Sequence, residues 1–178
     1  MKLALISLGC SKNLVDSEHY LGILSKRKGM ELTSELSEAD IVIVNTCGFI
    51  GDAKEESIET ILEVSEFKET GNLKKLIVAG CLAQKYSEEI LKELPEVDAV
   101  IGTGDIEKIE KVVDEILENK KVVETKNMTF LANANTERVL TTASHTAYLK
   151  ISEGCNRACT YCIIPQMRGR LRSRSIED

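Results

Sequence analysis

Apolar residues in the first 120 positions fall into short runs separated by longer amphipathic stretches. The runs are rich in β-branched residues and predict strands at Lys2–Leu8, Met30–Thr33, Ala39–Cys47, Lys74–Cys81 and Ala99–Gly102. Between them, apolar residues recur at helical spacing, which predicts helices at Asn13–Lys26, Asp52–Phe67, Leu82–Leu94 and Asp105–Asn119. Alternating strands and helices indicate an α/β fold with a parallel sheet covered on both faces.

The connections determine how such a sheet is wound. Right-handed crossovers make it doubly wound, and we expect a flavodoxin-like strand order of 2-1-3-4-5. The link between the second and third strands is short for a helical crossover, so the sequence determines that end of the sheet least.

The pattern changes after residue 120. Residues 121–144 are mostly polar and lack clear periodicity, which predicts a linker with one strand at Val122–Val123. An apolar stretch at Thr146–Ile151 predicts a strand that begins a new unit. We therefore expect an α/β domain at 1–120, a linker at 121–144 and the incomplete start of a second domain at 145–178.

Composition narrows the class of protein. Apolar residues make up 43% of the chain and charged residues 29%, as in soluble globular proteins. The apolar runs are of strand length and the N-terminus lacks the pattern of a secretory signal, so we expect no membrane span. We expect a cytoplasmic protein, and a monomer. The six cysteines are not placed like a disulfide framework, because three end apolar runs and three form one cluster.

Charge is distributed unevenly. From Lys150 to Asp178 there are six Lys or Arg against three Asp or Glu, a net charge of +3, whereas the remainder carries −9 from 17 basic and 26 acidic residues. The basic run Arg168–Arg174 is suited to phosphate, an acidic partner, a cofactor or a substrate, and equally to a solvated strand edge. Charge alone does not decide between these roles.

Three cysteines form the pattern C-x3-C-x2-C at Cys155, Cys159 and Cys162. One short loop with this spacing can place three thiolates on three irons of a cuboidal iron–sulfur cluster, because thiolates are the usual ligands of such clusters. The fourth iron then stays open for a substrate. The alternative is a zinc knuckle with His145 as fourth ligand, but zinc sites usually pair cysteines as C-x2-C.

Three further cysteines, Cys10, Cys47 and Cys81, each follow a predicted strand. Parallel strands end at one edge of a sheet, where ligands bind, so these thiols converge if the first, third and fourth strands are neighbours. A glycine flanks each of them: Gly9, Gly48 and Gly80. We interpret the set as a second cluster site. The alternatives are three buried structural cysteines and a redox disulfide, although this half contains no C-x-x-C pair.

The C-x3-C-x2-C loop and the preceding Ala147–Gly154 resemble the radical S-adenosylmethionine (SAM) superfamily. With both cysteine sets in view, the whole chain resembles a radical-SAM methylthiotransferase. Within that class it resembles the RimO branch in the stretches Ser7–Glu18, Asn45–Ile50, Ala53–Ile58 and Gly80–Leu82. The resemblance implies an N-terminal flavodoxin-like domain followed by the opening segment of a radical-SAM partial (β/α) barrel.

This resemblance also implies the chemistry. It implies two 4Fe-4S clusters, with SAM on the open iron of the Cys155 set and the backbone of Tyr161 beside the adenine. The Cys10 set would carry sulfur or a methylthio group. The substrate would be an aspartate β-carbon of small-subunit ribosomal protein S-twelve, with an external electron donor and a sulfur donor as partners. Because the family continues into a full partial barrel and a C-terminal domain, we expect this chain to be a fragment that is inactive alone.

Two other functions stay open. One is methylthiolation of a tRNA adenosine, as in the MiaB branch, which tends to have Gln-Met-Asn after its first cysteine where this chain has Lys12-Asn13. The other is a non-catalytic, metal-binding flavodoxin-like module.

The sequence also predicts where several individual residues lie. Four polar residues should lie near the first cysteine set, either hydrogen-bonded to cluster ligands or in caps and turns: Lys12, Asn13, Asp16 and Asn45. His19 is expected on the surface of its helix. Three aromatic residues are expected in the core: Tyr20, Phe67 and Tyr86.

Overall fold

The computed structural model describes residues 1–126 and 128–178, and its main body is a six-stranded, all-parallel sheet with the order β2-β1-β3-β4-β5-β6. The strands are β1 (Lys2–Ser7), β2 (Glu31–Leu32), β3 (Ile41–Thr46), β4 (Lys75–Ala79), β5 (Ala99–Ile101) and β6 (Val122–Glu124). The flavodoxin-like order is confirmed, and the strand predicted at Val122–Val123 adds a sixth position beside β5.

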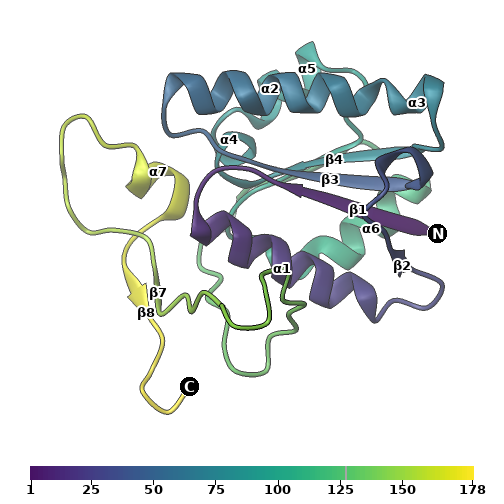
Figure 1. The fold of residues 1–178 in the computed structure, drawn as a ribbon. Coiled ribbons are helices and arrows are strands. Elements are labelled where there is room, and N and C mark those ends of the chain that lie inside the picture. The colour runs from purple at the N-terminus through teal and green to yellow at the C-terminus, as the bar shows by residue number, and fades with distance from the viewer. Residues whose placement is uncertain (127) are drawn as a thin grey trace.

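Helices cover both faces of the sheet, so the α/β, doubly wound fold is confirmed (Figure 1). One face carries α1 (Ser11–Ser25) and α6 (Ile109–Leu117), and the other carries α2 (Gly51–Ser65), α3 (Phe67–Thr70), α4 (Gly80–Lys85) and α5 (Ser87–Glu93). The short link between β2 and β3 forms only the 3-10 turn η1 (Leu36–Glu38), and a second turn, η2 (Ile106–Lys108), precedes α6.

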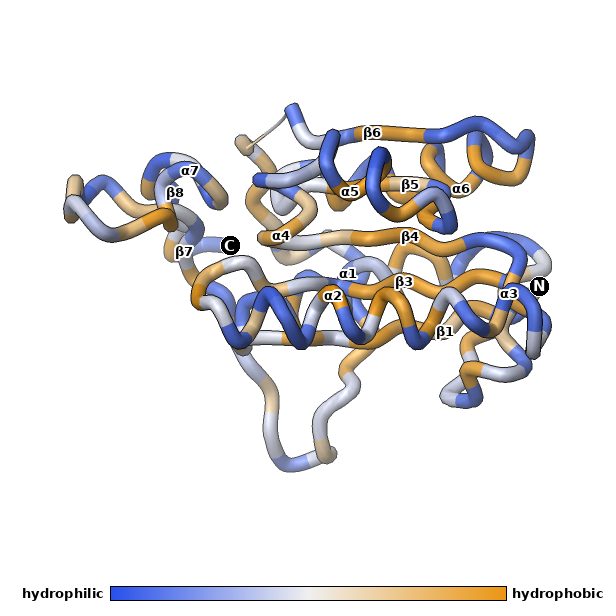
Figure 2. The backbone as a smooth tube through the Cα atoms, turned by 90° about the horizontal axis from the view of Figure 1, so that it is seen from above, coloured by the Kyte–Doolittle hydropathy of each residue, from blue (hydrophilic) through white to orange (hydrophobic). Residues whose placement is uncertain are grey.

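Strand β3 shows how the two cores divide. All six of its residues are buried. Ile41 and Ile43 pack with residues of α1 and α6, whereas Val42 and Val44 pack with residues of α2, α4 and α5. Successive side chains of a strand point to opposite faces, so a central strand covered on both sides must be apolar at every position. The apolar strands therefore lie between the two layers of helices (Figure 2).

The helix predicted over Leu82–Leu94 is divided in two at Tyr86, whose backbone (φ −122°, ψ 34°) is not helical. The break lets Leu82 of α4 and Ile90 of α5 both reach the core beneath α2. Tyr20 is buried as expected, and Phe67 and Tyr86 lie half-buried against the same helix-covered cores.

After β6 the chain runs along α1 and then forms a small antiparallel pair, β7 (Ser152–Glu153) with β8 (Arg172–Ser173), with α7 (Ile164–Arg168) between them. The strand predicted at Thr146–Ile151 is wrong. A strand requires a neighbouring strand, and within residues 146–153 only Ser152 and Glu153 pair with one. The antiparallel pair and α7 lie beyond the carboxyl ends of the central strands (Figure 1).

The prediction that His19 is a surface residue is also wrong, since only 5% of it is exposed. The segment around Glu137 and Arg138 lies directly on α1, and the Nδ1 atom of His19 is 2.8 Å from the carbonyl oxygen of Glu137. Gly22 permits this close approach, because a Cβ there would lie 2.4 Å from the backbone nitrogen of Arg138. None of the helices in the described part of the chain has the length and apolar character needed to span a bilayer.

Candidate metal centres

Cys10, Cys47 and Cys81 lie at one edge of the sheet, where three neighbouring strands end. Cys10 follows β1 and precedes α1, Cys47 directly follows β3, and Cys81 is the second residue of α4 after β4. Strand β3 pairs with β1 on one side and with β4 on the other. The convergence expected from the sequence is therefore present in the backbone. Cys10 is exposed, Cys47 half-buried and Cys81 buried.

Glycines bring the three cysteine loops into contact. A Cβ on Gly9 would lie 2.8 Å from the Cβ and 3.1 Å from the Sγ of Cys47, so the first loop packs directly on the second. A Cβ on Gly48 would lie 3.0 Å from the backbone nitrogen of Leu82, so the second loop packs on the third. Gly9 also has φ +86°, a conformation that favours glycine.

Asn13 joins these loops through one buried side chain. Its Nδ2 donates to the carbonyl oxygens of Leu8 (3.0 Å) and Thr46 (2.9 Å), and the Sγ of Cys81 lies 3.7 Å from its Oδ1. The Nδ2 of Asn45 donates to the backbone oxygen of Asn13 at 2.8 Å. The first turn of α1 has no side-chain cap, so these two asparagines organise the cysteine edge instead of capping a helix.

Two opposing effects determine the pKa of the Cys81 thiol. Burial raises its pKa, and the nearby guanidinium of Arg168 lowers it without cancelling the effect of burial. Metal binding must therefore displace a proton from Cys81, because a thiolate is the form that binds metal.

The second set, Cys155, Cys159 and Cys162, lies on the loop between β7 and α7. The base of this loop is fixed, because the amide of Cys155 donates to the carbonyl oxygen of Gly169 at 3.1 Å. Gly154 has φ +78°, and a Cβ there would lie 2.2 Å from the carbonyl oxygen of Arg170. Any other residue at position 154 would displace the loop.

The outer part of this loop faces solvent. Cys159 is exposed and 89% of Tyr161 is exposed. The backbone N–H of Arg157 donates to the Sγ of Cys155 at 3.4 Å, so this contact orients the thiol. The interaction of Tyr161 with an adenine stays a prediction.

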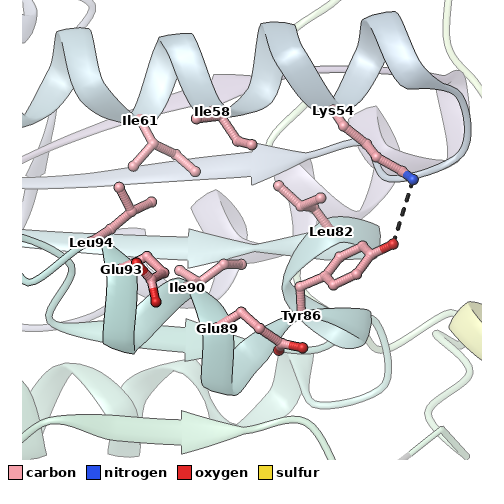
Figure 3. A pocket seen from close by; sticks show the side chains of 9 residues that line it. All are labelled: Lys54, Ile58, Ile61, Leu82, Tyr86, Glu89, Ile90, Glu93 and Leu94. Carbon is pink, nitrogen blue, oxygen red and sulfur yellow. Dashed lines mark hydrogen bonds between the residues drawn. The ribbon is translucent and has the colours of Figure 1, made fainter.

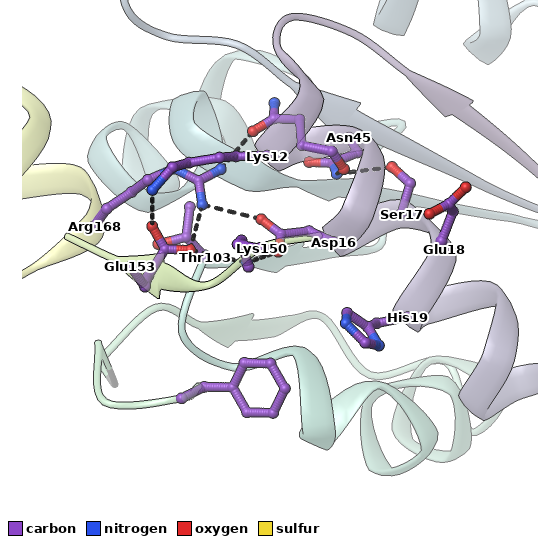
Figure 4. Close-up of polar contacts among 12 residues, drawn as sticks. Lys12, Asp16, Ser17, Glu18, His19, Asn45, Thr103, Lys150, Glu153 and Arg168 are labelled. Carbon is purple, nitrogen blue, oxygen red and sulfur yellow. Dashed lines mark hydrogen bonds and ion pairs between the residues drawn. The ribbon is translucent and has the colours of Figure 1, made fainter. Parts of the chain in front are cut away.

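A buried group of charges joins the second loop to the first cysteine edge (Figure 4). Arg168 Nη1 lies 2.8 Å from Glu153 Oε2 and 3.1 Å from Asp16 Oδ2. Lys150 pairs with Asp16 and also, at 2.8 Å, with Glu153. Lys12, which is 40% exposed, adds a contact of 3.5 Å to Glu153. We call Asp16, Lys150, Glu153 and Arg168 the charged joint.

The pairing shifts the pKa values of Glu153 and Arg168. Burial would raise the pKa of Glu153, but Arg168 and Lys150 outweigh it and bring that pKa to about 2. Burial would likewise lower the pKa of Arg168, and Asp16, Cys81 and Glu153 raise it instead. Buried charges are tolerated only when paired in this way.

Sequence reasoning placed Asp16 near the site but missed the part played by Lys150, Glu153 and Arg168. Arg168 is 3% exposed, so it does not belong to a solvated basic edge. Asp16 and Arg168 are 152 residues apart, and no local pattern connects them. The one local signal is the spacing of Lys150 and Glu153, three residues apart beside the cysteine loop.

The donor chemistry fits iron–sulfur clusters. Each set offers three thiols without a disulfide, on loops whose close packing depends on glycine. No three His, Cys, Asp or Glu side chains within 1–126 and 128–178 are gathered as a single metal ion would require, and His145 is exposed. The zinc-knuckle alternative therefore gains no support from the geometry.

A separate hollow lies between α2 and α5 (Figure 3). Its volume is about 310 Å³, and Lys54 Nζ and the Tyr86 hydroxyl lie 3.5 Å apart at one end. The rest of its lining is chiefly aliphatic: Ile58, Ile61, Leu82, Ile90 and Leu94. It contains no thiol, and we assign it to the packing of the helix layer.

The fold and the cysteine edge thus define an α/β module that carries two three-cysteine sets. Residues 2–102 match the family described as "Uncharacterized protein family UPF0004", and the chain belongs to that family. Over its length the chain is also similar to proteins named ribosomal protein uS12 methylthiotransferase RimO. It is 54% identical to that of Clostridioides difficile over 178 residues and 55% identical to that of Lachnoclostridium phytofermentans over 177 residues.

A third relative of the same name, from Pelotomaculum thermopropionicum, is 52% identical over 178 residues. These alignments cover 99–100% of this chain and 40% of each relative. The chain therefore spans about two fifths of the length of the curated relatives it matches.

Proposed function

We propose that this chain is part of a methylthiotransferase that inserts a methylthio group at the β-carbon of an aspartate in ribosomal protein uS12. The observation that carries the proposal is the presence of two three-cysteine sets, one at the carboxyl edge of the sheet and one on the adjoining loop, joined by buried charges. Similarity to RimO proteins over 99–100% of this chain supports the substrate.

Each set would hold one 4Fe-4S cluster, and the Cys155 set would also bind SAM. When bound and reduced, such a cluster supplies the electron for reductive cleavage of SAM, which yields a radical able to take hydrogen from an unactivated carbon. The chain's own residues hold and orient the ligands. Asn13 fixes the loops of the first set, and the N–H of Arg157 contacts the Sγ of Cys155.

The exposed side of the second loop, with Cys159 and Tyr161, would be the side that SAM approaches. The domain organisation belongs to the same proposal: an N-terminal domain at 1–120, a linker at 121–144 whose first residues supply β6, and the start of a radical-SAM barrel at 145–178. The protein would act as a cytoplasmic monomer, with an external reductant and a sulfur donor.

Iron and sulfide analysis after anaerobic reconstitution tests the two sites. We expect about eight irons per chain for the unchanged protein, and about four for Cys10→Ala and for Cys155→Ala, because each cubane holds four irons. In the full-length enzyme, Cys155→Ala should also abolish SAM cleavage, whereas Cys10→Ala should retain it. One zinc per chain, or loss of SAM cleavage in Cys10→Ala, would contradict the proposal.

The substrate is tested separately. The reconstituted full-length enzyme that contains this chain is supplied with SAM, a reductant, uS12 and tRNA in one reaction, and both macromolecules are analysed by mass spectrometry. A methylthio group on uS12 supports the proposal. A methylthio group on tRNA adenosine alone overturns the substrate and favours the MiaB-type reaction.

A further inference from the structure

We propose that Arg168 is a positioning residue which, together with Asn13, fixes the second cysteine loop relative to the first cysteine set. The inference rests on the proposed function, because the spacing of the two sets matters only if both hold clusters. It assigns to Arg168, the first residue of the basic run Arg168–Arg174, a role that charge alone did not decide.

The contacts of Arg168 reach both halves of the site. Arg168 ends α7, six residues after Cys162, and its side chain points back to α1. Its Nη2 donates to Asn13 Oδ1 at 2.6 Å, and its Nη1 contacts Asp16 at 3.1 Å and Glu153 at 2.8 Å. One rigid guanidinium thus joins the residues on either side of the second loop to the helix that follows Cys10.

Asn13 carries this contact into the first cysteine set. The same Oδ1 that accepts from Arg168 lies 3.7 Å from the Sγ of Cys81. The Nδ2 of the same side chain holds Leu8 and Thr46, the residues that precede the loops of Cys10 and Cys47. A shift of Arg168 would therefore move the asparagine on which the first set depends.

The balance of charges in the charged joint determines which substitutions of Arg168 leave a buried charge unpaired. The charged joint contains two carboxylates and two cations, each at most 5% exposed. Removal of Arg168 alone leaves Asp16 and Glu153 to share Lys150. The double change D16N/R168Q instead leaves Lys150 paired with Glu153, so no buried charge is left unpaired.

A second tie keeps α7 attached without Arg168. The hydroxyl of Thr103, which follows β5, donates to the carbonyl oxygen of Met167 at 2.6 Å. Loss of the guanidinium should therefore loosen the position of the loop without releasing the helix. A displaced but folded loop is what a test of positioning requires.

The experiment compares the unchanged chain with R168Q, D16N/R168Q and R170Q, the last a matched control because Arg170 is exposed. In the metal-free protein we expect the amide of Cys155 to exchange hydrogen about tenfold faster in both Arg168 variants, since charge-assisted hydrogen bonds that restrain the loop are lost. Exchange in β3 and β4 should be unchanged. R170Q should match the unchanged chain.

After anaerobic reconstitution and reduction, electron paramagnetic resonance measures the interaction between the two clusters, which falls steeply with their separation. We expect the Arg168 variants to retain their iron but to show an altered interaction. The reduction potential of the Cys10-set cluster should fall in R168Q, because a positive charge beside Cys81 is lost, and should fall less in D16N/R168Q, which also removes the negative charge of Asp16. If R168Q does not fold, the measurements on D16N/R168Q test the positioning role of Arg168.

The outcomes are distinguishable. Unchanged exchange and unchanged cluster interaction in folded Arg168 variants would overturn the inference and leave the proposed function intact. Faster exchange with an unchanged interaction would show a merely structural role, which also overturns it. An unchanged chain that binds no iron would overturn the proposed function and, with it, this inference.

Discussion

Gly9 lies so close to Cys47 that a Cβ on Gly9 would meet the Cβ of Cys47 at 2.8 Å. Contact between the first two cysteine loops thus depends on the absence of a side chain at position 9. The left-handed backbone of Gly9, with φ +86°, adds a second requirement for glycine.

Gly9→Ala should therefore destabilise the protein by roughly 3 kcal/mol, the sum of backbone strain and overpacking. Gly29→Ala is a matched control, because Gly29 has φ +81° but nothing within 4 Å of its added Cβ. The control should cost only the strain, about 1–2 kcal/mol. Urea unfolding measures both, and equal losses of stability would refute the predicted contact.

Gly22 is a glycine in the middle of α1, and replacing it by alanine ordinarily stabilises a helix by about 1 kcal/mol. Here we expect Gly22→Ala to destabilise the protein, since its Cβ would lie 2.4 Å from the backbone nitrogen of Arg138. Limited proteolysis should detect faster cleavage near residues 133–141. Gly51→Ala, at the first position of α2 with open space around its Cβ, should not destabilise the protein. A stabilised Gly22→Ala would mean that the segment does not press on α1.

The sheet could be predicted because its signals are local. Apolar runs such as Ile41–Val44 mark strands covered on both faces, and the rule that parallel strands end at one edge brought Cys10, Cys47 and Cys81 together. The C-x3-C-x2-C spacing likewise predicted that Cys155, Cys159 and Cys162 lie on one loop.

The errors concern contacts between distant segments. His19 resembles a surface residue until the segment 118 residues later lies on it. Arg168 resembles part of a basic tip until it meets Asp16, 152 residues earlier. The strand predicted at Thr146–Ile151 failed because strand propensity requires a neighbouring strand. Sequence periodicity describes one element at a time and contains no information about such partners.

The burial of His19 predicts a pH dependence of stability. Burial lowers its pKa below the ordinary value of 6.5, so the unfolded chain binds a proton more readily than the folded protein. Stability should therefore fall as the pH decreases below about 6.5, by at most about 1.4 kcal/mol per pH unit. Thermal unfolding between pH 7.5 and 5.5 measures this loss.

His19→Asn removes the titrating group and should flatten the profile in that window. Glu18 acts in a different range. Burial would raise its pKa, but hydrogen bonds from Thr141 and Arg138 lower it overall, so its contribution is lost only as the pH falls below about 4.5. A profile that stays equally steep above pH 5.5 in His19→Asn would show that another group is responsible.

Thr103 tests how α7 is held against the sheet. Its buried hydroxyl donates to the carbonyl oxygen of Met167 at 2.6 Å, and Thr103→Val removes that donor while preserving the shape of the side chain. We expect a loss of about 1–3 kcal/mol, because the buried carbonyl is left without this partner. Thr60→Val is the control, since the exposed Thr60 hydroxyl bonds only within α2, to Glu56. It should change stability by no more than about 0.5 kcal/mol. Chemical denaturation of the two variants side by side gives the difference, and equal effects would show that the Thr103 hydrogen bond does not hold α7.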